Sequence, residues 1–385
     1  MVVKHSIHRK KNFFSRNILI NNLFSKNKKA IIEIQFNWIF IFIVGSVILM
    51  FFIFVGKSYL ENSNLKLSGK VLYDLDSIMK GATSSSKSAS NLPIPKLKLE
   101  FTCYPECSTE GCDSSFAISN TGVNKPTPHE VMFAPSNIDS DYLITWTLDW
   151  KMPFRVGNFL YLTSPDNRYI FVYDDNLLES KTMAEKLYNL FLDNEYITVE
   201  LYSESELIET FESTNHEHIR FIFFYPYDTD FELDIGKSNF DIIVFHDANP
   251  SFNGNVLFLG ANEASSQGDF EGSIGYFGKE AMVGAIFSED REFFICNMHK
   301  AFNHLERIFE IYKTRAIYLK TSPGSCSSIY IYDNFAQEEL PDDFGYPLYF
   351  KEEDFSIIES TLKTMASNAE KVNQNAIFNS CPRLY

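Results

Sequence analysis

The sequence lacks the short motifs that mark common nucleotide-binding and catalytic sites. Its 385 residues contain no Walker-type phosphate loop, no G-x-G-x-x-G and no G-x-S-x-G. These absences exclude three motif-based assignments: a P-loop nucleotide site, a dinucleotide-binding fingerprint and the serine nucleophile of an α/β-hydrolase. The sequence predicts no cofactor.

Acidic residues are nearly absent from the first 35 residues. Eight Lys and Arg stand there against the single acid Glu33, which gives this segment a net charge of +7. The whole chain carries −16, so residues 36–385 carry −23. An acidic body repels phosphate groups, and this excludes nucleic acid as a partner.

Charged residues are missing entirely from Phe36 to Val55, a run of twenty residues. A helix of that length spans roughly 30 Å, the thickness of the hydrocarbon core of a bilayer. The run is longer than the apolar part of a secretory signal, and no A-x-A-like cleavage site follows it. We therefore predict a transmembrane helix at 36–56, with the lipid bilayer as its partner. The positive-inside rule predicts a cell-membrane protein with segment 1–35 in the cytoplasm and the C-terminal body outside the cell.

The stretch KKAIIEIQFNWIFIFIVG resembles the N-terminal segment of uncharacterised single-pass membrane proteins of small-genome archaea. It is also similar, more loosely, to the class III signal of archaeal type IV pilins, in which a basic-Gly/Ala site precedes an apolar helix. That resemblance implies cleavage after Ala30 and a mature chain that begins at Ile31. Glu33 departs from the pattern, because it would be the third residue after the cut, whereas pilins place their acid at the fifth. A second stretch, LITWTLDWKMPFRVGNFLYLTSPDNRYIFV, is similar to the same archaeal group.

No cysteine precedes residue 103, so all six follow the apolar run. They are Cys103, Cys107, Cys112, Cys296, Cys326 and Cys381. Cysteines on one side of a membrane are what an oxidising exterior favours, and we predict disulfides. Six cysteines allow 15 pairings, and at least one of the first three must pair outside that trio if all are bonded. A zinc site with C-x3-C-x4-C spacing is the rival interpretation, although no fourth ligand lies nearby in the sequence.

Beyond the apolar run the pattern has three parts. Residues 57–95 predict a juxtamembrane helix to about 80 and then a linker rich in Ser and Pro at 81–95. Residues 96–163, which contain three of the cysteines, predict a small β-rich segment. From 164 to 385 strands alternate with helices, which predicts an α/β fold with a flavodoxin-like or Rossmann-like parallel sheet. Within this last part we expect helices at 177–192, 290–313 and 352–374, and final strands at 316–320 and 328–333.

Carboxylates stand at the ends of two predicted strands. Asp174 and Asp175 follow YIFVY, Asp247 follows FDIIVFH, and Lys279 follows a further apolar segment. This arrangement loosely resembles the receiver domains of response regulators, and the resemblance implies a divalent-metal or phosphoryl site at the carboxyl edge of the sheet. The alternative is that these Asp residues solvate a turn or cap the helix that follows.

The histidines offer weaker candidates. Alternation along a strand places His216 and His218 on one face, as a metal pair would need, with a solvated turn as the alternative. His246 and Asp247 are the candidate catalytic residues of a hydrolase. Six glycines between residues 254 and 278 predict a surface loop.

These patterns support three hypotheses. The first is a membrane-anchored cell-surface protein that binds or scaffolds protein partners without catalysis. The second is a pilin-like filament subunit that is cleaved after Ala30. The third is an ectodomain hydrolase.

Overall fold

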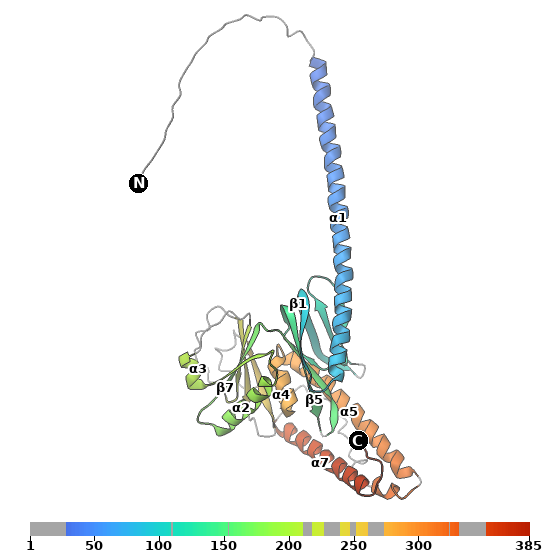
Figure 1. The fold of residues 1–385 in the computed structure, drawn as a ribbon, viewed down its shortest axis with the longest axis vertical. Coiled ribbons are helices and arrows are strands. Elements are labelled where there is room, and N and C mark those ends of the chain that lie inside the picture. Colours follow the sequence, from blue (N-terminus) through green and yellow to red (C-terminus); the bar gives the residue numbers. More distant parts are fainter. Residues whose placement is uncertain are drawn as a thin grey trace, which may run out of the picture. The chain divides into compact units, whose positions relative to one another are not determined.

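The chain forms two compact units in the computed structural model, Met1–Ser63 and Asn64–Tyr385 (Figure 1). The structure describes residues 28–385, apart from 109–110, 153, 211–217, 227–238, 247–251, 261–272, 323 and 331–351. The second unit contains both regions that we predict as separate parts, 96–163 and 164–385.

The first unit is described through helix α1 (Lys28–Ser84), which continues into the second unit. Its stretch Trp38–Val55 has a mean hydropathy of 2.9, and none of it is buried inside the structure. This stretch is long and apolar enough to cross a bilayer, and it lies within the transmembrane helix that we predict at 36–56. The juxtamembrane helix that we predict at 57–80 belongs to the same helix.

The linker that we predict at 81–95 is mostly regular structure. Helix α1 runs to Ser84, and four residues separate it from strand β1 (Ala89–Ser108). Prolines at positions 93 and 95 lie inside β1, where the pairing with β5 shifts its register. Such an irregularity accommodates residues that have no N–H to donate, so Pro and Ser content was a poor guide here.

The first sheet has six strands in the order β3-β2-β1-β5-β6-β4. Its neighbours are antiparallel, except that β4 pairs parallel with β6. The strands after β1 are β2 (Gly111–Ile118), β3 (Asn124–Pro126), β4 (Met132–Phe133), β5 (Asn137–Lys151) and β6 (Arg155–Thr163). The C-terminal turns of α1 pack on this sheet through Leu72, Leu75 and Met79, which are all buried.

The second sheet has the order β12-β11-β10-β9-β7-β8. Strands β8, β7, β9 and β10 are mutually parallel, whereas β11 is antiparallel to both of its neighbours. The strands are β7 (Asn167–Tyr173), β8 (Thr198–Ser203), β9 (His218–Phe223), β10 (Asn239–His246), β11 (Asn253–Gly260) and β12 (Ile274–Phe277). The two sheets and their helices confirm the predicted α/β class.

Helices cover both faces of the second sheet. On one face Phe191 of α2 (Leu178–Leu192) meets Phe171, with ring centroids 5.1 Å apart. On the other face Leu207 of α3 (Glu204–Thr210) packs in one cluster with Ile170 and Val172. Successive residues of a strand point to opposite faces of the sheet, so the apolar strand β7 contributes side chains to the packed layer on each face.

Helix α4 (Gly278–Phe287) contacts strands of both sheets and is almost wholly buried. The Trp150 indole donates a hydrogen bond to the Phe277 carbonyl (3.2 Å), and the Tyr161 hydroxyl donates to that of Glu280 (2.8 Å). Helices α5 (Arg291–Thr321) and α7 (Glu352–Phe378) belong to the same apolar core. One core therefore joins the two sheets.

The structure corrects three element predictions. Residues 316–320 are helical within α5, because the buried stripe of that helix continues to Ala316 and outweighs the local β preference. Residues 327–330 form a short 3-10 helix, where we predict the start of a strand, and 331–333 lie outside the described residues. The described parts of the loop predicted at 254–278 lie mostly in β11 and β12.

Candidate functional site

Two of the three carboxylates predicted as a metal site, Asp174 and Asp175, accept hydrogen bonds in the described structure. Asp174 Oδ1 accepts hydrogen bonds from the backbone N–H of Asn176 (2.7 Å) and from its side-chain amide (3.1 Å). The Asp175 carboxylate accepts from the Ser205 hydroxyl (3.2 Å) at the start of α3. Such contacts are typical of the turn that we gave as the alternative interpretation, and the metal site stays a prediction.

The other predicted site residues are only partly described. His246 is buried at the end of β10, whereas Asp247 and His216 lie outside the described residues. The hydrolase hypothesis for His246 and Asp247 therefore stays a prediction. Lys279 is exposed in the first turn of α4.

All six cysteines are paired, which confirms the predicted disulfides. The pairs are Cys103–Cys296, Cys107–Cys112 and Cys326–Cys381. Cys103 is the member of the first trio that pairs outside it, across 193 residues of sequence. Within the described part of the chain, one set of His, Cys, Asp and Glu side chains is compact enough to share a metal ion, and it consists of Cys107, Cys112 and Cys296.

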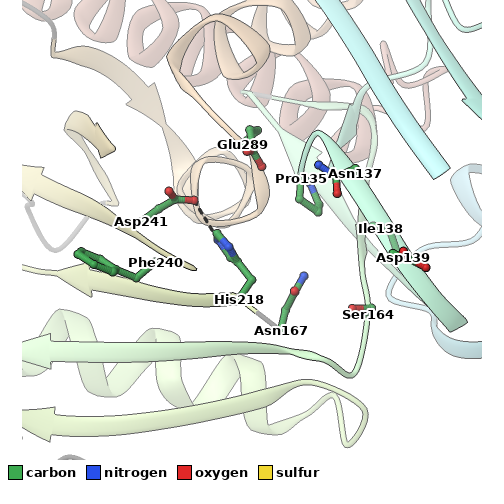
Figure 2. Close-up of a pocket in the computed structure, with 10 residues that line it drawn as sticks. All are labelled: Pro135, Asn137, Ile138, Asp139, Ser164, Asn167, His218, Phe240, Asp241 and Glu289. Atoms are coloured by element: carbon green, nitrogen blue, oxygen red, sulfur yellow. Dashed lines mark ion pairs between the residues drawn. The ribbon is translucent and has the colours of Figure 1, made fainter. Parts of the chain in front are cut away.

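A polar cleft of about 530 Å³ lies at the amino-terminal edge of the parallel strands (Figure 2). The starts of β7, β9 and β10 form one side of it, and the start of β5 with the turn before it forms the other. The lining residues are Pro135, Asn137, Ile138, Asp139, Ser164, Asn167, His218, Phe240, Asp241 and Glu289. The cleft thus lies where the two sheets approach each other.

His218 and Asp241 point toward each other within the cleft, as Figure 2 shows, with 2.9 Å between Nε2 and the carboxylate. Asp241 also pairs at 2.9 Å with the guanidinium of Arg220, which is 3% exposed and lies beneath the cleft. Arg220 and Asp241 are direct neighbours in the ladder between β9 and β10. The sheet register therefore places these opposite charges in contact.

Arg220 also holds the C-terminal end of α4. Its guanidinium donates hydrogen bonds to the carbonyls of Ile286 (2.8 Å) and Ser288, and more distantly to that of Glu289 (3.4 Å). Carbonyls at the end of a helix have no intrahelical partner, so the guanidinium satisfies groups that burial would otherwise leave unpaired.

Glu289 connects this arrangement to the first sheet. Its carboxylate accepts the backbone N–H of Ser136 (3.0 Å), and its own N–H donates to the carbonyl of Ala134 (3.2 Å). Ser136 directly precedes β5, and Ala134 lies two residues before Ser136. The two walls of the cleft are thus linked by hydrogen bonds through the α4–α5 connection.

The electrostatics of the cleft favour an ionised Asp241. Burial alone would raise the pKa of its carboxyl, but the hydrogen bond from His218 and the positive charge of Arg220 lower that pKa to about 2. Asp139 and Glu289 add two further carboxylates to the lining. The cleft therefore presents mainly hydrogen-bond acceptors, together with the amides of Asn137 and Asn167.

The sequence named His218 as a metal candidate together with His216, but its carboxylate candidates lie at the carboxyl ends of the strands, and it did not predict this cleft. Its most informative residues, His218 and Asp241, stand at the opposite ends. One signal was available: Arg220 and Asp241 are opposite charges inside two otherwise apolar strands. Their pairing became evident only once the strands were known to be neighbours.

Comparisons with protein-family models, with curated proteins and with solved structures found no match to this chain.

Replacing Asp241 by Asn should destabilise the protein by about 3 kcal/mol at pH 7, since a buried guanidinium then loses its carboxylate partner. In the wild-type protein the pKa of Asp241 lies below that of an unfolded Asp. The stability that ionised Asp241 contributes is therefore fully present above about pH 4 and is lost as the pH falls toward 2. Urea unfolding at pH 7 and pH 3 would measure both effects.

Asp139→Asn is the matched control, because Asp139 lines the same cleft but is exposed. Its loss should change stability by less than about 0.5 kcal/mol. This view of the ion pair would be contradicted if the two substitutions lowered the free energy of unfolding equally. It would also be contradicted if the difference in that free energy between Asp241→Asn and wild type were the same at pH 3 as at pH 7.

Proposed function

We propose that this chain is a membrane-anchored cell-surface protein whose folded body binds or scaffolds other surface components without catalysis. Residues 1–35 lie in the cytoplasm, α1 crosses the membrane once, and the body lies outside. The observation that carries this proposal is the stretch Trp38–Val55, which is apolar over its full length and has no part buried within the protein. Such a surface is stable in lipid and costly in water.

The disulfides support an exterior location. Two of them close loops of 193 and 55 residues, which strongly restrict an unfolded chain. Disulfides persist in oxidising surroundings, whereas cytosolic reductants keep thiols reduced. The body therefore suits the side of the membrane opposite to its basic N-terminal segment.

The polar cleft supports a binding role. It is open to solvent, holds the carboxylates of Asp139 and Glu289, and is built on the rigid edges of two sheets. Nucleophilic catalysis by cysteine has no support in the described structure, since every cysteine is in a disulfide. We propose that the cleft receives a polar group of a surface component.

We further propose a relationship in architecture to flavodoxin-like folds. The four parallel strands lie side by side in the sheet in the order β8, β7, β9 and β10. When they are numbered by their order along the chain, this is 2-1-3-4, which is the start of the flavodoxin-like order. Strand β11 departs from it, because it is antiparallel to β10. In such sheets ligands bind at the carboxyl edge, whereas the cleft of this chain lies at the amino edge.

Replacing Val47 and Ile48 together by Arg should abolish stable membrane insertion. Each Arg near the centre of a spanning helix costs about 3 kcal/mol for insertion. After alkaline carbonate extraction of native membranes, the wild-type chain should remain in the pellet and the double variant should be lost from it.

Tyr73→Arg is the matched control, since Tyr73 is an exposed aromatic residue on the same helix beyond the apolar stretch. This variant should stay in the pellet with the wild type. Release of the wild-type chain by carbonate, or retention of the double variant, would contradict the anchor.

The pilin-like subunit is the second candidate, and the continuity of α1 favours it. The helix runs from Lys28 through the apolar stretch and then packs on the first sheet, so one helix would serve both assembly and folding. This candidate predicts a mature N-terminus at Ile31, which N-terminal peptide mapping of the native protein would detect. A chain that keeps its basic segment would contradict it.

A further inference from the structure

Four cysteines from three elements meet at one end of the first sheet. Cys103 and Cys107 belong to β1, Cys112 to β2 and Cys296 to α5. They form two disulfides, Cys103–Cys296 and Cys107–Cys112. The sulfur atoms of Cys107, Cys112 and Cys296 all lie within 4.8 Å of one another, so the two disulfides are neighbours.

The four cysteines differ in their access to solvent. Cys296 is fully buried, and Cys103 and Cys112 are nearly so, whereas Cys107 is half-buried near the β1–β2 turn. An external thiol therefore reaches Cys107 first. Attack there releases Cys112, whose sulfur lies 3.7 Å from the carbonyl oxygen of Cys296.

Basic side chains lie near the backbone next to Cys112. Its N–H donates to the carbonyl of Pro128, and the adjoining hollow beside Gly111 is lined by basic side chains. These are His129, Lys300, His304 and Arg307. Burial lowers the pKa of Lys300 to about 7, and the opposing charge in this region is Glu130.

We propose that these two disulfides form a thiol–disulfide exchange site that accepts reducing equivalents from an external dithiol. One thiolate of the dithiol attacks Cys107, forming a mixed disulfide and releasing Cys112 as a thiolate. The second thiol of the dithiol attacks the mixed disulfide and releases Cys107, so the dithiol is oxidised to its disulfide. Two electrons and two protons have then passed to the protein.

The second stage is an internal exchange without net oxidation or reduction. The Cys112 thiolate attacks Cys296, a Cys112–Cys296 disulfide forms, and Cys103 leaves as a thiolate that takes up a proton. Helix α5 stays bonded to the first sheet, but its partner changes from β1 to β2. The reduced cysteines at the end are Cys103 and Cys107, so one thiol has moved from β2 to β1.

The exchange is tested on the full chain in detergent micelles with dithiothreitol as the dithiol, at one equivalent per protein and pH 8. After an acid quench, unfolding and alkylation, peptide mapping identifies the labelled cysteines. We expect label on Cys103 and Cys107 together with a Cys112–Cys296 peptide. Label confined to Cys107 and Cys112, with Cys103–Cys296 intact, would overturn the proposal.

A second measurement needs no reductant. Cys107→Ser leaves Cys112 as the one unpaired cysteine, and exchange should distribute the alkylation label between Cys112 and Cys103. Cys326→Ser is the matched control, because the sulfur of Cys381 is not part of the compact sulfur group of the described residues. There the label should stay on Cys381. Label on Cys112 alone in the first variant would also overturn the proposal.

Discussion

The arrangement of the two sheets depends on the contacts of one buried group, the guanidinium of Arg220. It lies in β9 and contacts Asp241 of β10 and the last carbonyls of α4. A buried charge is costly unless it is paired, and these partners accept hydrogen bonds from both terminal nitrogens of the guanidinium. The position of the α4 end then determines where Glu289 lies, and Glu289 holds the backbone just before β5. Two sheets of different topology are thereby linked through the α4–α5 connection.

The cleft is a consequence of this joint. The two sheets share one apolar core around α4. The polar amino-terminal ends of β5, β7, β9 and β10 lie outside that core and enclose the cleft. Charged groups that hold the sheets together, such as Asp241, also line the open space. Structural ion pairs and the lining of the cleft therefore use the same residues.

The sequence was informative where the physical signal was local. The helix from Phe36 to Val55 could be predicted without knowing any tertiary contact, because the length of the run and its lack of charge were sufficient. The alternation of strands and helices after residue 164 likewise predicted the α/β class. By contrast, the Cys103–Cys296 pair joins residues far apart in the chain, and composition does not choose among 15 pairings. The contact of Arg220 with Asp241 depended on strand order, which no local pattern determines.

The most direct test of this account is hydrogen–deuterium exchange on the Arg220→Lys variant. Lysine keeps the charge but cannot donate in several directions from one planar group. We expect lost protection at the end of α4 near residues 286–290. Through Glu289, protection should also be lost near residues 134–138, while β2 and β3 at the far end of the first sheet stay protected. Lost protection confined to β9 and β10 would contradict the claim that Arg220 joins the two sheets.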